Sequence, residues 1–215
     1  SHSMAENTGF VTNFLAGVVS KESYKQLIAD FYFIYTALEE QVDKFKDDPF
    51  IAPIAFDELK RVPALEKDCE FYWGENWKSI IAPTDACKNY VTRVKKINAK
   101  FLVGHHYTRY LGDLSGGQIL KNIANKSMNL DGQGLAFYEF DGISNPKGFK
   151  ERYRHALDNL PITWSDGELI INEANYAFKL NMDVFDEIGS SRPFPLISTI
   201  QGLLQLAWGS MKSKK

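Results

Sequence analysis

The chain has few of the residues that would link it to a disulfide framework or to nucleic acid. Its 215 residues include two cysteines. Cys69 and Cys87 lie far apart and match no metal-binding or redox spacing, so we interpret them as small buried residues of a reducing compartment. The 25 basic and 27 acidic residues give a net charge of −2. Because basic residues are not in excess, the charge gives no reason to expect a nucleic-acid partner.

Long apolar runs and leader features are also missing. No run of 18 apolar residues occurs, so we expect no transmembrane segment. The most apolar stretch, residues 196–208, contains four polar side chains, and a packed C-terminal helix is favoured over a segment lying on a membrane. We expect no signal peptide; the opening Ser1–Met4 suggests that upstream residues are missing or that these four are a vector remnant.

Helical periodicity is present almost everywhere. Apolar residues recur at steps of three and four along three stretches, which predicts amphipathic helices: Leu27, Phe31, Ile34, Leu38 and Val42; Tyr90, Val94, Ile97 and Phe101; and Ile170, Ala174, Phe178, Asn181, Phe185 and Ile188. The sequence therefore predicts an all-α fold with one domain over residues 1–190. We expect residues 191–215 to be a helical C-terminal segment, packed on this domain or peripheral to it.

Several helix boundaries carry local signals. Ser165 with Glu168 predicts a capping box, and Asn145-Pro146 predicts an N-cap followed by proline in the first turn. Prolines and the Asp131–Gly134 stretch predict breaks between helices. The one stretch that competes as a strand is Leu135–Phe140.

Glycines interrupt one of the predicted helices. Residues 101–124 have a helical pattern, but Gly104, Gly112, Gly116 and Gly117 lie within it. Each glycine inside a helix costs about 0.8–1 kcal/mol relative to alanine. Gly112 and Gly116 are four apart and share a face, where a flat ligand could lie on bare backbone. Close packing against another helix explains the same glycines equally well.

A charged pair lies among these glycines. Asp113 follows Arg109 by four residues, which places both side chains on one helix face. Such a pair is ordinarily a solvated ion pair. Beside a helix face without side chains, however, a carboxylate and a guanidinium can order water and relay protons.

The whole segment Tyr107-Thr-Arg-Tyr-Leu-Gly-Asp-Leu-Ser-Gly-Gly-Gln118 resembles the distal-helix signature of haem oxygenases without a gap. The resemblance continues from His2–Asn7 through Tyr35–Glu40, Phe137–Phe140 and Asn172–Asn175 to about Glu187. The chain is most similar to cyanobacterial and algal members. This resemblance implies a single-domain helical fold with haem held between a proximal and a distal helix.

The resemblance also implies roles for individual residues around the iron. His2 corresponds to the proximal iron ligand, with Glu6 one turn later as the partner of its second ring nitrogen. His105 and His106 are the rival ligands, and we interpret them as packing or surface histidines. On the distal side, Gly112 and Gly116 would press on the haem face, and Asp113 would hold a proton-delivering water network steadied by Arg109 and Tyr35.

The haem periphery has its own predicted contacts. Lys150 and Arg154, four residues apart, correspond to the family's propionate-binding cations, and Tyr107 corresponds to their tyrosine partner. Phe178 and Phe185 correspond to the aromatic pocket wall, although spacing alone would make them simple core residues. We interpret Lys147 and Arg152 as solvated.

The implied activity is cleavage of haem by O2 to biliverdin, of the IXα isomer, with CO and Fe2+. Haem is then both substrate and cofactor. No nucleotide or flavin motif is present, so electrons would come from a partner. Ferredoxin is the expected donor, docking near Lys121, Lys126, Lys150 and Arg154. We expect a monomer in the cytoplasm, or in the plastid stroma for an alga. The alternative is a protein that stores or senses haem without degrading it.

Overall fold

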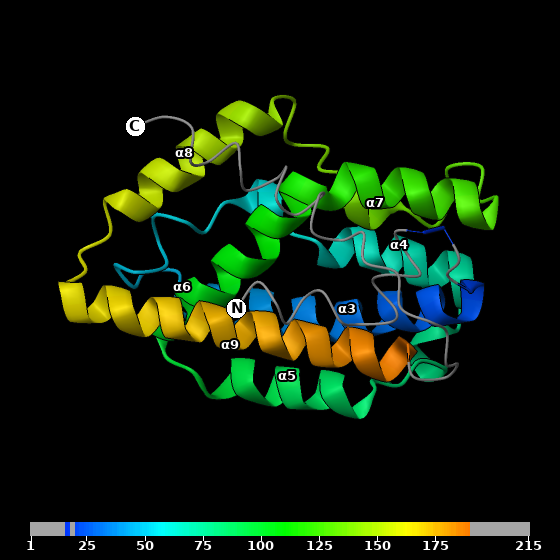
Figure 1. Cartoon of the computed structure of the whole chain (residues 1–215), viewed down its shortest axis with the longest axis horizontal. Helices are drawn as coiled ribbons and strands as arrows, with labels where there is room; N and C mark the ends of the chain where they lie inside the picture. The colour runs from blue at the N-terminus through cyan, green and yellow to red at the C-terminus, as the bar shows by residue number, and fades with distance from the viewer. Residues whose placement is uncertain (1–15, 18–19, 190–215) are drawn as a thin grey trace.

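The computed structural model describes residues 16–17 and 20–189, and all regular elements in this part of the chain are helical, with no strand. In chain order they are α3 (Lys21–Lys44), η1 (Asp57–Leu59), α4 (Val62–Trp73), η2 (Trp77–Ser79), α5 (Asp85–Lys96), α6 (Ala99–His106), η3 (Tyr107–Leu111), α7 (Gly112–Met128), η4 (Ala136–Tyr138), α8 (Pro146–Asp158) and α9 (Trp164–Gly189). The labels are those of Figure 1. The all-α prediction is confirmed.

The centre of the molecule is α3, which packs against α4, α5, α6 and α9. Its predicted apolar stripe is buried, with Ile34 and Leu38 fully covered. Full burial of such a side chain stabilises the fold by about 1.5–3 kcal/mol. The helix begins after Ser20, whose hydroxyl accepts the Ser23 N–H at 3.1 Å, as expected of an N-cap.

Two outer layers lie on either side of this core. In Figure 1, α9 runs beside α3, with α5 next to it, and α7 and α8 lie on the opposite side. The tightest approach is between α6 and α9: a Cβ added at Gly104 would lie 2.9 Å from the Ala174 nitrogen and from the Ile170 carbonyl oxygen. Gly104 therefore serves helix packing, as the alternative interpretation of the glycines proposes.

The helix-boundary predictions have mixed outcomes. The side chain of Asn145 caps α8, with Pro146 in its first turn, as predicted. The capping box predicted at Ser165 with Glu168 is wrong. A capping box forms two residues earlier, where the Thr163 hydroxyl accepts the Asp166 N–H and the Asp166 carboxylate accepts the Thr163 N–H.

The possible strand at Leu135–Phe140 is not formed; Ala136–Tyr138 is the 3-10 helix η4. The predicted continuous helix over residues 101–124 is divided into α6, η3 and α7. Figure 1 shows that α7 leaves α6 in a different direction. No described helix is long and apolar enough to cross a membrane.

Candidate active site

The change of direction between α6 and α7 takes place at the π-helical turn η3. A π turn holds one residue more than an α-helical turn, and such turns are frequent at functional sites and at helix kinks. The turn places Arg109 and Tyr110 in the interior, where they are 5% and 2% exposed. Arg109 is therefore brought inward to face α3.

Three polar side chains from α3, η3 and α7 meet there. The Tyr35 hydroxyl donates a hydrogen bond to Asp113 Oδ2 and accepts one from Arg109 Nε at 3.0 Å. The Arg109 guanidinium also lies 3.5 Å from Asp113 Oδ1. Tyr35 is fully buried, and the Asp113 side chain is 12% exposed. The solvated pair considered from spacing alone is thus a nearly buried pair with a third partner.

Two further residues hold Arg109 in place. Its second nitrogen donates to the Asn181 side-chain oxygen on α9, and the guanidinium carbon lies 4.5 Å from the centre of the Phe31 ring. A cation over an aromatic face is stabilised, more so when both groups are desolvated. The sequence did not reveal these contacts, although a buried asparagine within the apolar stripe of α9 was a usable signal.

Burial and the neighbouring charges both shift the ionisation of these three side chains. It raises the pKa of the Asp113 carboxyl, while the Arg109 charge, the Tyr35 hydroxyl and the more distant Arg61 charge lower it. Burial also raises the pKa of Tyr35 well above its usual value. For Arg109, burial disfavours the charge, but nearby Tyr35 and Asp113 outweigh it and the pKa is raised. The raised pKa values keep Arg109 charged and Tyr35 neutral, while burial shifts the Asp113 carboxyl toward its protonated form.

The face of α7 beside Asp113 has little on it. A Cβ added at Gly112 or Gly116 would have no described atom within 4 Å, whereas one at Gly117 would lie 3.4 Å from the Tyr138 ring. The glycines thus divide into two kinds. Gly104 and Gly117 face packed neighbours, whereas Gly112 and Gly116 form a strip of helix that no other described residue covers at the Cβ position.

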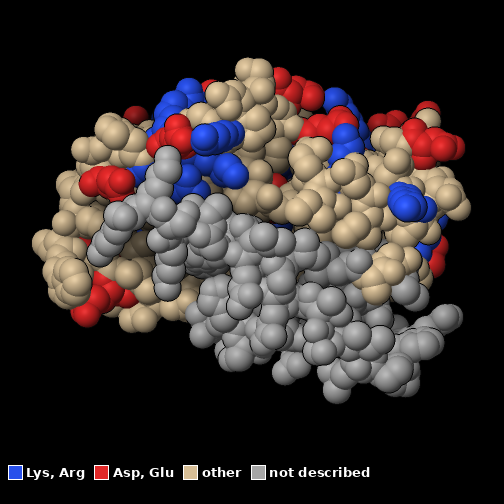
Figure 2. Space-filling view, turned by 45° about the horizontal axis from the view of Figure 1, so that its top comes forward, with Lys and Arg blue, Asp and Glu red and all other residues tan. Residues whose placement is uncertain are grey.

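The cations of α8 also divide into two kinds. Lys150 and Arg154 are both half-buried, and burial, with the nearby Arg154 charge, lowers the pKa of Lys150. Arg152 is exposed and pairs with Glu58 at 2.7 Å, and Lys147 is exposed. Figure 2 shows basic side chains gathered over the end of the molecule where α8 lies. Two adjacent half-buried cations fit an anionic ligand.

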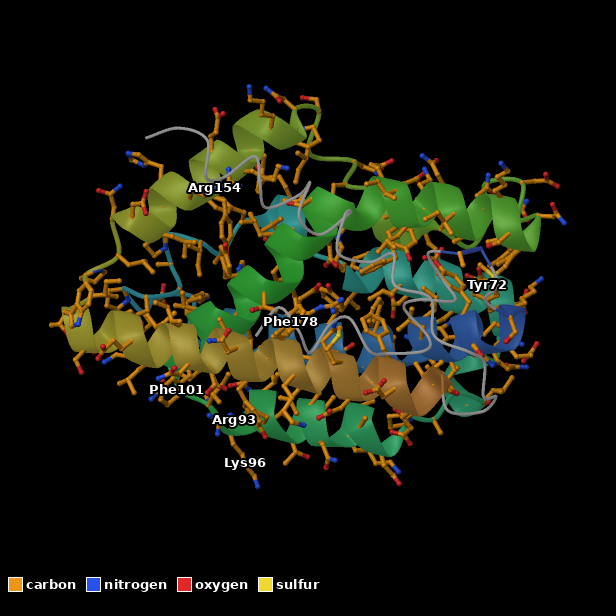
Figure 3. All side chains as sticks on the ribbon, viewed as in Figure 1. Tyr72, Arg93, Lys96, Phe101, Arg154 and Phe178 are labelled. Atoms are coloured by element: carbon orange, nitrogen blue, oxygen red, sulfur yellow. The ribbon has the colours of Figure 1, made fainter. Side chains whose placement is uncertain are left out.

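The expected aromatic residues lie on α9 and η3. Phe178 and Phe185 are half-buried, and the Phe185 ring lies 6.3 Å, centre to centre, from Phe31 beneath Arg109. Figure 3 places Phe178 on α9 and Arg154 on α8. Tyr107 is half-buried in η3.

The two rival histidines are interior packing residues. His105 lies 2.8 Å from the Glu173 carboxylate and His106 lies 2.7 Å from the Tyr153 hydroxyl. Burial lowers the pKa of His106 to about 3. The described residues contain no group of three or more potential metal ligands. The predicted iron ligand His2 and its partner Glu6 lie outside the described residues.

Comparison with known proteins identifies the family. The model of the family described as "Heme oxygenase" matches residues 1–187. The chain belongs to the haem oxygenase family. Haem oxygenase activity, with haem as substrate and cofactor, follows from this membership, and it sets aside the alternative of a haem carrier.

Individual relatives agree with this assignment. The chain is 52% identical to Heme oxygenase 1 of Synechocystis over 191 residues, which are 87% of this chain and 80% of the relative. It is 50% identical to a heme oxygenase of Rhodella violacea, over 89% of this chain and 83% of the relative.

The fold agrees as well. The crystal structure of the Synechocystis heme oxygenase-1 in complex with heme has a TM-score of 0.85 at 46% identity, covering 98% of this chain and 94% of that one. The structure of heme oxygenase from Leptospira interrogans has a TM-score of 0.83 at 39% identity, covering 86% and 93%.

Proposed function

We propose that this member of the family opens haem with O2 and electrons from a partner, releasing biliverdin (the IXα isomer), CO and Fe2+. The observation that supports this best is the Tyr35–Arg109–Asp113 group beside the bare strip of Gly112 and Gly116. A protein that only carries haem needs an iron ligand and anionic anchors, but not a buried acid held next to such a strip.

The distal face of haem would lie on the backbone of Gly112 and Gly116. Bound haem supplies the iron that activates O2 and the ring that is oxidised. Because no side chain projects from Gly112 or Gly116, the ring could approach the helix backbone closely, with Asp113 next to Gly112 in the chain. The residues present fit the group.

Asp113 would act on protons. Its carboxylate is held by the Tyr35 hydroxyl and by Arg109, and burial raises its pKa above the ordinary value. We infer that Asp113 orders water above the haem and passes protons through that water. Tyr35 and Arg109 fix the direction in which its oxygens point.

The haem edge would be anchored by α8. Lys150 and Arg154 are the proposed partners of the two propionates, and Tyr107 is the proposed third contact. Phe178 and Phe185 would form the aromatic wall on the α9 side. Burial and the nearby Arg154 charge lower the pKa of Lys150. A propionate carboxylate bound beside Lys150 would raise that pKa again, because an opposite charge favours the charged amine.

The proposed proximal ligand is His2, with Glu6 accepting a hydrogen bond from its second ring nitrogen. Both assignments rest on the resemblance of residues 2–7. They predict that His2→Ala alters the spectrum of the ferric haem complex and that added imidazole restores it. An unchanged spectrum would place the ligand elsewhere.

We propose a ferredoxin as the electron donor, since the relatives compared include cyanobacterial and red algal proteins. The four predicted docking cations do not form one patch. Lys126 lies near the end of α7 farthest from α8 (Figure 1), and Lys121 pairs with Glu139 at 2.5 Å. Lys150 and Arg154 are therefore the better candidates. Ferredoxin-driven turnover should fall with added salt, while ascorbate-driven turnover should not.

We also propose a compartment and an assembly state for the chain. Cys69 and Cys87 are buried free thiols, which suits the reducing cytoplasm or plastid stroma. We propose that the chain acts as a monomer, since the predicted site uses residues of one chain.

The test is to add haemin, and then ascorbate or reduced ferredoxin, in air. The proposal predicts loss of the Soret band and growth of the broad biliverdin absorption. A haem spectrum that stays constant with both reductants would contradict it.

A further inference from the structure

Residues 134–139, which include η4, form a strap between α4 and α7. The strap begins at Gly134, which has a φ of +65°. A Cβ added there would lie 2.5 Å from the Phe71 ring and 2.7 Å from the Tyr72 hydroxyl oxygen. Only glycine fits this backbone conformation in so little space.

A buried acid on α4 holds the strap. Asp68 is 1% exposed. Its two carboxylate oxygens accept the N–H groups of Ala136 and Phe137, each at 2.8 Å. One helical turn later, the Tyr72 hydroxyl donates to the Gly134 carbonyl at 3.1 Å. The strap is thus attached to α4 through its backbone.

Arg61, just before α4, holds the other side of the same backbone. Its guanidinium donates to the carbonyl oxygens of Phe137, at 3.1 Å, and Glu139, and its carbon lies 3.7 Å from the centre of the Phe140 ring. Phe137 is therefore fixed at both its N–H and its carbonyl.

The opposite edge of the strap supports α7. Gln118 Nε2 donates to the Tyr138 carbonyl at 3.0 Å, Gly117 lies against the Tyr138 ring, and Lys121 pairs with Glu139. The Phe137 ring lies 5.4 Å, centre to centre, from the Tyr35 ring. One segment thus contacts both the helix that carries Asp113 and the tyrosine that binds it.

No other described element supports α7 to this extent. Apart from η3, with which it is continuous, the described element that α7 packs against most is η4. A shift of the strap would therefore move α7 relative to α3.

We propose that Asp68 is a positioning residue for the distal helix. By holding the strap, it sets Asp113 and the glycine strip of α7 at the correct place relative to Tyr35, although its own hydrogen bonds go to the strap. Each of its two oxygens accepts one N–H. An asparagine in the same place would keep one acceptor oxygen and turn a donating NH2 group toward the other N–H.

The first test uses hydrogen exchange in the haem-free protein, so it does not depend on the proposed function. In Asp68→Asn we expect the amides of Ala136–Tyr138 and of the first half of α7 to exchange about tenfold faster. The exchange rates of the α5 amides should not change. Glu70→Gln is the matched control, since it removes the same charge from an exposed position on α4. It should change neither segment.

Two results would overturn the proposal. In one, the strap exchanges faster while α7 keeps its protection. In the other, α5 and α7 lose protection equally, which would make Asp68 a residue of general stability. As a second variant, Gln118→Ala removes the link from the side of α7. It should speed exchange in α7 and leave the Ala136 and Phe137 amides protected.

A further readout rests on the proposed function. Asp68→Asn should lower the biliverdin yield per haem consumed by a larger factor than it lowers the haem affinity, because the proposed anchors on α8 and the proposed iron ligand are unchanged. A normal yield together with altered exchange in α7 would overturn the positioning role. No biliverdin from the natural chain would instead refute the proposed function and leave the exchange test intact.

Discussion

Tyr35 lies fully buried on α3, yet its hydroxyl contacts both charged groups of the site. It donates to Asp113 and accepts from Arg109. The sequence identified these three residues through the resemblance. It could not show that Asn181 and Phe31 complete the surroundings of Arg109, because those contacts depend on how α9 and α3 are placed relative to η3.

The Tyr35 hydroxyl can be tested by its removal. In Tyr35→Phe, Asp113 loses a hydrogen bond that stabilises its charged form, so its pKa should rise further. The acidic limb of the pH–turnover profile should then move to higher pH, with haem affinity retained. Tyr90→Phe is the control: it also deletes a buried hydroxyl, but one with no hydrogen-bond partner among the described residues. Equal profiles for the two variants would contradict the role given to Tyr35.

The α8 cations make a prediction about the haem carboxylates. Lys150→Ala and Arg154→Ala should each weaken haem binding by about tenfold or more, as expected for loss of a charge-assisted hydrogen bond. Lys147→Ala, at an exposed position on the same helix, should not. Binding is measured by Soret titration. With the haem dimethyl ester, which lacks the two charges, the variants should bind as the natural chain does. A loss of the same size with the ester would exclude propionate binding.

At the scale of elements, periodicity predicted the long helices well, because α3 and α9 each bury one continuous stripe. It failed at local details. The stretch after Pro161 holds two overlapping capping patterns, Thr163 with Asp166 and Ser165 with Glu168, and only the entry of the chain into α9 selects the first. The π turn η3 was not predictable either, because one extra residue in a turn leaves the flanking apolar pattern helical.

The two kinds of glycine should respond oppositely to alanine. Gly116→Ala removes a helix-weakening residue in open space, so the haem-free protein should gain about 1 kcal/mol, or about 2–4 °C in Tm, while haem binding weakens. Gly104→Ala places a methyl group against the α9 backbone and should cost about 1–3 kcal/mol. Thermal unfolding of the two haem-free variants checks both signs. A lower Tm for Gly116→Ala would mean that this helix face is packed.

The buried carboxyl of α4 gives a dependence of stability on pH. Burial raises the pKa of Asp68 from 3.8 to about 6, against the effect of its two N–H partners. Between these pH values the folded protein binds more protons than the unfolded chain. The protonated Asp68 side chain therefore stabilises the fold at pH 4 and below, and this contribution to the free energy of unfolding is lost as the pH rises from about 4 to 6. The loss is about 3 kcal/mol for a shift of this size.

Denaturant unfolding at a series of pH values tests this for Asp68. Asp30, Glu39 and Asp113 also have raised pKa values. The comparison is therefore between the natural chain and Asp68→Asn, in the slope of the free energy of unfolding against pH. This slope should be less steep in the variant. Equal slopes would show that Asp68 keeps its ordinary pKa in the folded state.

For the molecule as a whole, the fold brings together a site whose parts are distant in sequence. Tyr35 on α3, Arg109 in η3, Asp113 on α7 and Asn181 on α9 meet because α3 lies at the centre and the π turn directs η3 inward. The bare strip of α7 and the cations of α8 lie outside that core. Under the proposed function, this division would separate proton handling from anchoring of the ligand.

The proton-handling role of Asp113 is tested most directly by Asp113→Asn, which keeps the shape of the side chain and removes its charge. We expect the variant to bind haem with a normal Soret band. Its biliverdin yield per haem under ascorbate or reduced ferredoxin should fall by about a hundredfold or more, the usual effect of losing a general acid–base group. A variant that binds haem and makes biliverdin at the natural yield would contradict this role.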